Sequence, residues 1–205
     1  MDMGTQERND TFKSLKAPSE GLYKEKGSKF LAFAYPVVSE DEVKAYLEQI
    51  RKKYYDARHH CYAYRLGLNG DVWRYNDDGE PSSTAGRPIY GQILSRELSD
   101  VLIVVVRYFG GIKLGVPGLI RAYKSAAADA LDHAETVEKV ASELFSVTFD
   151  YTAMDRVMRV LKDMGISPLK YIAESECRME MRVRLRDTDT FVMRMGEAEA
   201  KVEHI

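Results

Sequence analysis

The sequence predicts an α+β protein of two domains, and three observations carry this prediction. A continuous apolar, β-branched run over residues 101–108 is typical of a central strand that is buried on both faces. A glycine-rich loop and an amphipathic helix follow that run. Beyond a change of pattern near residues 135–140, strand and helix signals come in the order β-α-β-β-α-β. We therefore expect a flexible tail over residues 1–19, one domain over 20–137 and a second over 138–205.

Composition limits the classes of function that are open to the chain. Its 205 residues carry 30 lysines and arginines against 32 aspartates and glutamates, a formal net charge of -2. This balance excludes a globally basic nucleic-acid binder, so nucleic acid would have to meet a local patch. No apolar run is long enough to span a bilayer, and the first residues lack the apolar core of a secretory signal. We therefore expect a cytoplasmic protein with no membrane segment.

The first domain is expected to open with a hairpin and a helix. Residues 21–26 and 29–38 have the aromatic and aliphatic content of two paired strands. Ser39 then stands three residues before Glu42, the spacing of a capping box. Apolar side chains recur at helical spacing from Val43 onward, so a helix is expected to begin here.

A second hairpin and two further helices follow. Residues 61–68 and 72–75 flank Asn69-Gly70, a pair that favours a type I′ turn because both residues tolerate positive φ. The polar loop over residues 76–86 leads to Pro88, which suits the first turn of a short helix. The other helix is expected over residues 117–134.

The second domain is expected to contain six elements, with Gly165 as a helix stop. Their order, β-α-β-β-α-β, is the ferredoxin-like arrangement. The strands are expected at residues 141–151, 167–173, 177–186 and 201–205, and the helices at residues 154–164 and 189–198.

The glycine-rich loop after the apolar strand is a candidate anion site. Residues 101–124 contain four cations and no acid, and four glycines lie within residues 110–118. Such a loop can direct backbone N–H groups into one concavity, and the next helix adds the positive end of its dipole. The loop is not a Walker A motif, because Val116 and Pro117 follow Gly115. The alternative is a tight turn whose glycines only permit close packing.

The acidic loop over residues 77–86 is the second candidate. Its three carboxylates and three hydroxyls suit a binding surface, or a turn with Asx hydrogen bonds that leads into a helix. Its spacing does not match an EF-hand, and no nucleophile motif occurs. His59 and His60 are adjacent on a strand and point to opposite faces, so they cannot share a metal by themselves. We expect no catalytic residue, metal or cofactor, and a hydrogen bond from His60 to the acidic loop.

A secondary basic face is expected in the second domain. Arg182, Arg184 and Arg186 alternate with apolar residues, which places all three on one face of a strand. Such a face can meet RNA or an acidic partner. Glu180 lies on the same face, so an ordinary solvated sheet surface is the alternative.

Four segments of the chain resemble the YigZ/IMPACT family, in order and in spacing. They are GSKF at residues 27–30, HCYAYRLG at 60–67, DDGEPSSTAGRPI at 77–89 and RYFGGIKLGVPGLIRAY at 107–123. The resemblance implies a first domain like the second domain of ribosomal small-subunit protein S-five. It implies a ferredoxin-like second domain, as in elongation factor G. It also implies translational regulation, because eukaryotic members bind the activator of the amino-acid-starvation kinase and so block that kinase.

The expected function is therefore a non-enzymatic, translation-associated regulator or RNA- or ribosome-binding protein. Its anion-binding cleft would lie between the DDGEPSSTAG and RYFGGIKLG loops. Two alternatives stay open: an enzyme that acts on a nucleotide or other phosphorylated small molecule, and a protein–protein scaffold whose two loops brace each other. The expected partners are the ribosome, RNA or a protein of the translation system. The residues expected at the cleft are His60, Asp78, Glu80, Ser82, Thr84, Gly86, Arg107, Tyr108, Gly110, Gly111, Lys113 and Arg121.

Overall fold

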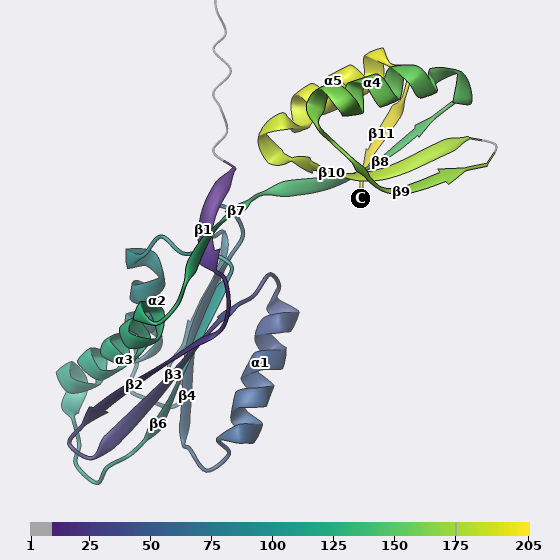
Figure 1. Cartoon of the computed structure of the whole chain (residues 1–205). Coiled ribbons are helices and arrows are strands. Elements are labelled where there is room, and N and C mark those ends of the chain that lie inside the picture. The colour runs from purple at the N-terminus through teal and green to yellow at the C-terminus, as the bar shows by residue number, and fades with distance from the viewer. Residues whose placement is uncertain (1–9, 175) are drawn as a thin grey trace, which may run out of the picture. The chain divides into compact units, whose positions relative to one another are not determined.

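The computed structural model describes residues 10–174 and 176–205. They divide into two compact units: a larger one, Phe12–Lys139, and a smaller one, Val140–Ile205 with residues 10–11. Both units combine antiparallel sheet with helices (Figure 1). None of the helices described is both long enough and apolar enough to cross a membrane.

The larger unit is built on a five-stranded sheet. Across the sheet the strands are β2 (Ser19–Glu25), β3 (Ser28–Pro36), β6 (Val101–Tyr108), β4 (His59–Leu66) and β5 (Val72–Asn76). Helix α1 covers one face, and α2 and α3 cover the other (Figure 1). The three helices are α1 (Glu40–Lys53), α2 (Gly86–Ser95) and α3 (Gly115–Asp132).

The central strand β6 is buried on both faces, as its sequence predicts. Val101, Ile103 and Val105 pack into the core under α2 and α3. The alternate residues of the strand, from Leu102 to Val106, pack into the core under α1. A strand that needs apolar residues on both faces reads as a continuous apolar run. This strand carries the candidate site at its carboxyl end.

Helix α1 begins at the predicted cap. The Ser39 hydroxyl accepts a hydrogen bond from the Glu42 N–H at 3.2 Å, and the Glu42 carboxylate accepts one from the Val38 N–H at 2.8 Å. The cap satisfies N–H groups that have no partner inside the helix. Its buried stripe includes Val43 and Leu47.

The β4–β5 hairpin is confirmed, but its predicted type I′ turn at Asn69-Gly70 is wrong. The last paired residues are Leu66 and Val72, so the loop is five residues long. Positive φ angles occur at Gly67 and Gly70 and not at Asn69. The reason is tertiary, because the Asp100 carboxylate accepts a hydrogen bond from the Gly67 N–H at 2.9 Å and holds the longer loop.

Two strands were not predicted from the sequence. β1 (Thr11–Leu15) pairs with β7 (Thr136–Val140) in a separate two-stranded sheet. Leu15 is 1% exposed, so the expected flexible tail is wrong over this strand, and its residues 1–9 lie outside the described part of the chain. The segment has too little apolar periodicity to be predicted as a strand. Its pairing partner lies more than a hundred residues away in the sequence, so no local pattern indicates the pairing.

The smaller unit has the predicted element order. It comprises β8 (Ser142–Phe149), η1 (Tyr151–Ala153), α4 (Met154–Met164), β9 (Pro168–Ala173), β10 (Cys177–Arg184), η2 (Leu185–Asp187), α5 (Thr188–Glu197) and β11 (Lys201–His204). The strand order is β11-β8-β10-β9, and α4 and α5 lie together on one face of the sheet (Figure 1). Gly165 ends α4 with a φ of 65°, as the sequence predicts.

An ion pair joins residue 10 to the rest of the smaller unit. The Arg184 guanidinium donates two hydrogen bonds to the Asp10 carboxylate, from Nε at 2.6 Å and from Nη2 at 2.9 Å. The Asp10 side chain is 3% exposed. These hydrogen bonds from Arg184 hold the pKa of Asp10 below its ordinary value.

Candidate functional site

The acidic loop between β5 and α2 is organised by Asp77. Its carboxylate accepts hydrogen bonds from the N–H groups of Ser83 (2.8 Å), Ala85 (3.0 Å) and Gly86 (2.8 Å). Asp77 therefore does the work of a cap for α2, although it lies nine residues before Gly86 in the sequence. The resulting fold of the loop turns the Glu80 side chain inward, where it is 4% exposed.

Glu80 joins the two loops through a buried network. Its Oε1 accepts hydrogen bonds from Arg107 Nη1 at 2.5 Å and from the Tyr123 hydroxyl at 2.8 Å. Cys61 Sγ lies 3.3 Å from the same hydroxyl. Burial raises the pKa of both Cys61 and Tyr123, so both are neutral groups at physiological pH. The carboxylate is thus committed to Arg107 and Tyr123.

A cavity of about 420 Å³ opens between these loops, at the start of α3. Glu80, Arg107 and Lys113 line it together with Gly115 and Val116 of the first helical turn. The start of α3 has no side-chain cap and no acidic residue in its first turn. Arg107 is 7% exposed, and its Nε has no hydrogen-bond partner.

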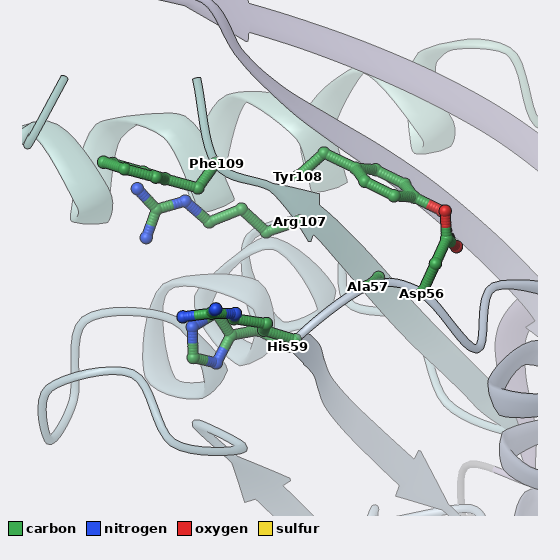
Figure 2. Close-up of a pocket in the computed structure, with 7 residues that line it drawn as sticks. Asp56, Ala57, His59, Arg107, Tyr108 and Phe109 are labelled. Carbon is green, nitrogen blue, oxygen red and sulfur yellow. Dashed lines mark hydrogen bonds between the residues drawn. The ribbon is translucent and has the colours of Figure 1, made fainter. Parts of the chain in front are cut away.

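A second cavity of about 570 Å³ is also lined by Arg107, and Figure 2 shows it. Arg107 and Phe109 extend from the end of β6, and His59 projects from β4 toward the same space (Figure 2). Arg58 also lines this cavity. The Tyr108 hydroxyl donates a hydrogen bond to Asp56 at 2.7 Å, and this bond raises the pKa of Tyr108 to about 12.

Arg107 and Phe109 line both cavities, and we call the two cavities together the Arg107 cleft. The guanidinium carbon of Arg107 lies 5.6 Å from the Phe109 ring centroid and 5.4 Å from that of Phe30. Cation–π contact and the Glu80 carboxylate therefore fix the guanidinium, while Phe109 stays 57% exposed. The cleft offers cationic and N–H groups with one exposed aromatic ring.

The part of the chain that forms the cleft matches a known domain. Residues 26–131 match the model of the Impact N-terminal domain. YvyE, an IMPACT family member of Bacillus subtilis, is 37% identical over 171 residues, which are 83% of this chain and 78% of the relative. The chain belongs to the IMPACT family. Every residue that lines the Arg107 cleft lies inside the matched domain.

Two further similarities extend along the chain. YigZ of Escherichia coli, another IMPACT family member, is 33% identical over 147 residues, covering 71% of this chain and 72% of the relative. The crystal structure of a hypothetical protein superimposes with a TM-score of 0.73 at 25% identity, over 96% of this chain and 98% of that one. The likeness to this solved structure therefore covers both units.

The structure brings only part of the predicted site together. Glu80, Arg107 and Lys113 line one cavity, and Tyr108 lines the other. The remaining predicted residues of this IMPACT domain line neither cavity: His60, Asp78, Ser82, Thr84, Gly86, Gly110, Gly111 and Arg121.

Local contacts explain why several of these residues are diverted. Arg121 forms an ion pair with Glu25 at 2.6 Å on the outer surface of the helix. The Asp78 carboxylate accepts a hydrogen bond from the backbone N–H of His60 at 2.6 Å. His60 is therefore linked to the acidic loop as predicted, but through its main chain. Thr84 donates its hydroxyl to the Pro81 carbonyl at 2.6 Å.

Sequence reasoning missed Arg58, His59 and Phe109. The places of Arg58 and His59 at the cleft depend on the pairing of β4 with β6, which sets His59 opposite Arg107. A pairing register between strands far apart in sequence is invisible to local pattern. Phe109 carried one usable signal, because it is a large aromatic residue in a glycine-rich loop, and loops often carry contact residues.

The secondary basic face differs from its prediction. β10 ends at Arg184, and Arg186 lies in η2, where its guanidinium is 3.7 Å from the Asp187 carboxylate. The chain leaves the sheet here, so Arg186 is not on the strand face. Arg178 takes its place, and its Nε donates to the Ser146 hydroxyl at 2.9 Å. Arg184 is held by Asp10.

The described residues contain no group of side chains suited to bind a metal ion. Among residues 10–174 and 176–205, no three His, Cys, Asp or Glu side chains gather in a way that could hold a metal ion.

Proposed function

We propose that this IMPACT-family chain is a non-enzymatic, translation-associated regulator of the cytoplasm that binds RNA or the ribosome through the Arg107 cleft. The observation that carries the proposal is the buried Nε of Arg107, which has no partner and belongs to a side chain lining both cavities. A buried N–H donor without a partner costs free energy unless a ligand satisfies it. A phosphate oxygen is a suitable acceptor for a guanidinium.

The same proposal covers the identity of the two units. We propose that the larger unit is like the second domain of ribosomal protein S-five, and that the smaller unit is a ferredoxin-like domain, as in elongation factor G. The strand order β11-β8-β10-β9 with the β-α-β-β-α-β element order supports the second assignment. Fold likeness alone does not establish function, so the proposed function rests on the residues of the Arg107 cleft.

The buried chemistry of the cleft favours binding over catalysis. The Glu80 carboxylate is occupied by Arg107 and Tyr123, and so is a poor general base. Burial raises the pKa of Cys61, which keeps this thiol from acting as a thiolate nucleophile. His59 Nδ1 lies 2.8 Å from the Asp78 carbonyl, which orients the ring and engages this nitrogen.

A bracing scaffold is the second candidate, and the Arg107–Glu80 ion pair favours it. This pair joins the two loops at 2.5 Å with both side chains nearly buried. A buried pair of this kind adds specificity more readily than net stability. Bracing alone, however, explains neither the exposed Lys113 at the cavity nor the uncapped start of α3.

Co-sedimentation with ribosomes across a salt series tests the proposal. Lys113→Glu is the informative variant, because Lys113 is exposed and its replacement leaves the buried pair intact. Lys124→Glu is the matched control, with the same charge change at an exposed position of α3 that lines neither cavity. We expect the wild type to lose association as salt rises, since bound phosphates displace counterions. Lys113→Glu should weaken association roughly tenfold at low salt, and Lys124→Glu should not.

Two results would contradict the proposal. One is no ribosome association at low salt. The other is an equal loss in both variants, which would mean that overall charge and not the cleft governs binding. Arg107→Glu is a poor test, because it would place a second carboxylate beside buried Glu80.

A further inference from the structure

The two cavities of the Arg107 cleft share one exposed aromatic ring. Phe109 lines both of them and is 57% exposed. Its ring covers the Arg107 guanidinium, which is itself 7% exposed (Figure 2). Large apolar side chains on the surface are costly to leave in water, and aromatic rings are the usual stacking partners of unpaired bases.

Each cavity supplies its own cation. Lys113, the first turn of α3 and Arg107, whose Nε has no hydrogen-bond partner, line one cavity. Arg58 and His59 meet at the other. Of the two acids that line the cavities, buried Glu80 is paired with Arg107, and Asp56 accepts a hydrogen bond from the Tyr108 hydroxyl and keeps its negative charge. Each cavity therefore has an exposed cation of its own, and both cavities share the Phe109 ring.

This pattern matches one repeat of a nucleic-acid strand. An internal nucleotide carries a phosphate on each side of its sugar and one base between them. From the proposed function we infer that the Arg107 cleft holds a single unpaired nucleotide, whose base stacks on Phe109 and whose two flanking phosphates enter the two cavities. The phosphate beside Lys113 accepts the free N–H of Arg107 Nε and N–H groups at the start of α3.

The same chemistry exists in two sources, an unpaired nucleotide within RNA and a free nucleoside 3′,5′-bisphosphate. A nucleoside 5′-monophosphate fills only one cavity, and inorganic phosphate has no base. The four probes are therefore a short oligoadenylate, adenosine 3′,5′-bisphosphate, adenosine 5′-monophosphate and inorganic phosphate.

Titration calorimetry of the full chain with these probes tests the inference. We expect the bisphosphate to bind more tightly than the monophosphate, and the monophosphate more tightly than phosphate. Phe109→Leu should weaken bisphosphate binding at least about fivefold and leave phosphate binding unchanged, because stacking contributes about 1–3 kcal/mol per base. Phe109→Trp should retain binding. Ile112→Ala is the control, an exposed apolar residue of the same loop that lines neither cavity.

The cations give an independent readout. Arg58→Glu and Lys113→Glu should each weaken binding of the bisphosphate. If both phosphates are held, the double variant should lose more than either single variant. Both side chains are exposed, so neither change is expected to unfold the protein.

The outcomes separate this inference from the proposed function. Phosphate that binds as tightly as the bisphosphate would overturn the nucleotide site, as would Phe109→Leu without effect, and ribosome association could survive either result. A bisphosphate that binds where oligoadenylate does not would support the site and contradict an RNA partner. Oligoadenylate that binds more tightly than the bisphosphate, and loses affinity in Phe109→Leu, would support both.

Discussion

Gly110, next to Phe109, has no room for a side chain. A Cβ at this position would lie 1.9 Å from the carbonyl carbon of Gly27 and 2.2 Å from the Ser28 nitrogen. These are main-chain atoms of the neighbouring hairpin turn, which cannot move aside without breaking the β2–β3 register. The hydroxyl of Ser28 also accepts a hydrogen bond from the Gly110 N–H at 3.1 Å. The alternative interpretation of the glycine loop, close packing, therefore holds at this glycine.

Gly110→Ala is expected to lower the free energy of unfolding of the larger unit by about 2 kcal/mol or more, because the clash is with backbone. Gly91→Ala is the control, since a Cβ there meets no atom within 4 Å inside helix α2. The control should raise stability by about 0.5–1 kcal/mol through helix propensity. Urea unfolding followed by fluorescence of Trp73, the single tryptophan, measures both. Equal effects of the two substitutions would refute the steric account.

At the scale of elements, the loop between β5 and α2 depends on one carboxylate. The Asp77 carboxylate accepts hydrogen bonds from three main-chain N–H groups of the loop and the helix start. Without Asp77 these N–H groups would lose this partner. The same loop holds Glu80 against Arg107. Loss of Asp77 therefore acts on the cleft through the loop, with no direct contact to a ligand.

Asp77→Ala is expected to cost about 2 kcal/mol of stability, which is the scale of a lost cap together with unsatisfied N–H donors. Asp71→Ala, at an exposed position before β5, should change stability by less than about 0.5 kcal/mol. Urea titrations of both variants against the wild type decide the matter. A loss below about 0.5 kcal/mol for Asp77→Ala would show that water replaces the carboxylate without cost.

Elements with strong local signals were predictable from the sequence, and elements fixed by distant partners were not. α1 begins at its capping box, and β6 matches its apolar run, because both signals lie within the element. β1 and β7 are stabilised by each other across more than a hundred residues, so neither shows a pattern of its own. The Asn69-Gly70 turn was mispredicted because Asp100 holds a different loop.

The candidate site followed the same division. Arg107 and Lys113 were expected at the cleft because the glycine loop itself carries them, and both line it. Arg121 was expected there on charge alone, and pairing with Glu25 removes it. Arg58 and His59 enter through the β4–β6 register, which only the folded sheet defines.

At the scale of the whole molecule, the smaller unit is not one continuous stretch of chain. It combines Val140–Ile205 with residues 10–11, and the Asp10–Arg184 pair joins the two parts. Asp10 is nearly buried, and its charge is stabilised mainly by Arg184, with a further hydrogen bond from the Arg186 N–H at 3.4 Å. The stability of this unit should therefore respond to changes near the start of the chain.

Asp10→Asn is expected to destabilise the smaller unit at neutral pH by about 1.5–3 kcal/mol, the range for hydrogen bonds to a charged group. The pKa of Asp10 is lowered in the folded state from its ordinary value of 3.8. Its contribution is therefore complete above about pH 4 and is lost as the pH falls through the folded value. The wild type and the variant should converge in acid.

Amide hydrogen exchange of β8 and β10 measures this effect in the smaller unit alone. Glu48→Gln, at an exposed position of α1, controls for the loss of one negative charge. A stability difference between wild type and Asp10→Asn that persists unchanged down to the lowest pH would contradict the role of the charge.

The Asp10–Arg184 pair also has a consequence for synthesis of the chain. The two residues are 174 positions apart. At about 5–20 residues per second, a ribosome needs on the order of 10–35 s to add Arg184 after Asp10. During this interval the Asp10 carboxylate lacks the Arg184 guanidinium as its partner. The larger unit, in contrast, has all its residues as soon as Lys139 has left the ribosome. The larger unit of the nascent chain can therefore close before Arg184 is available, and the smaller unit can close only after it.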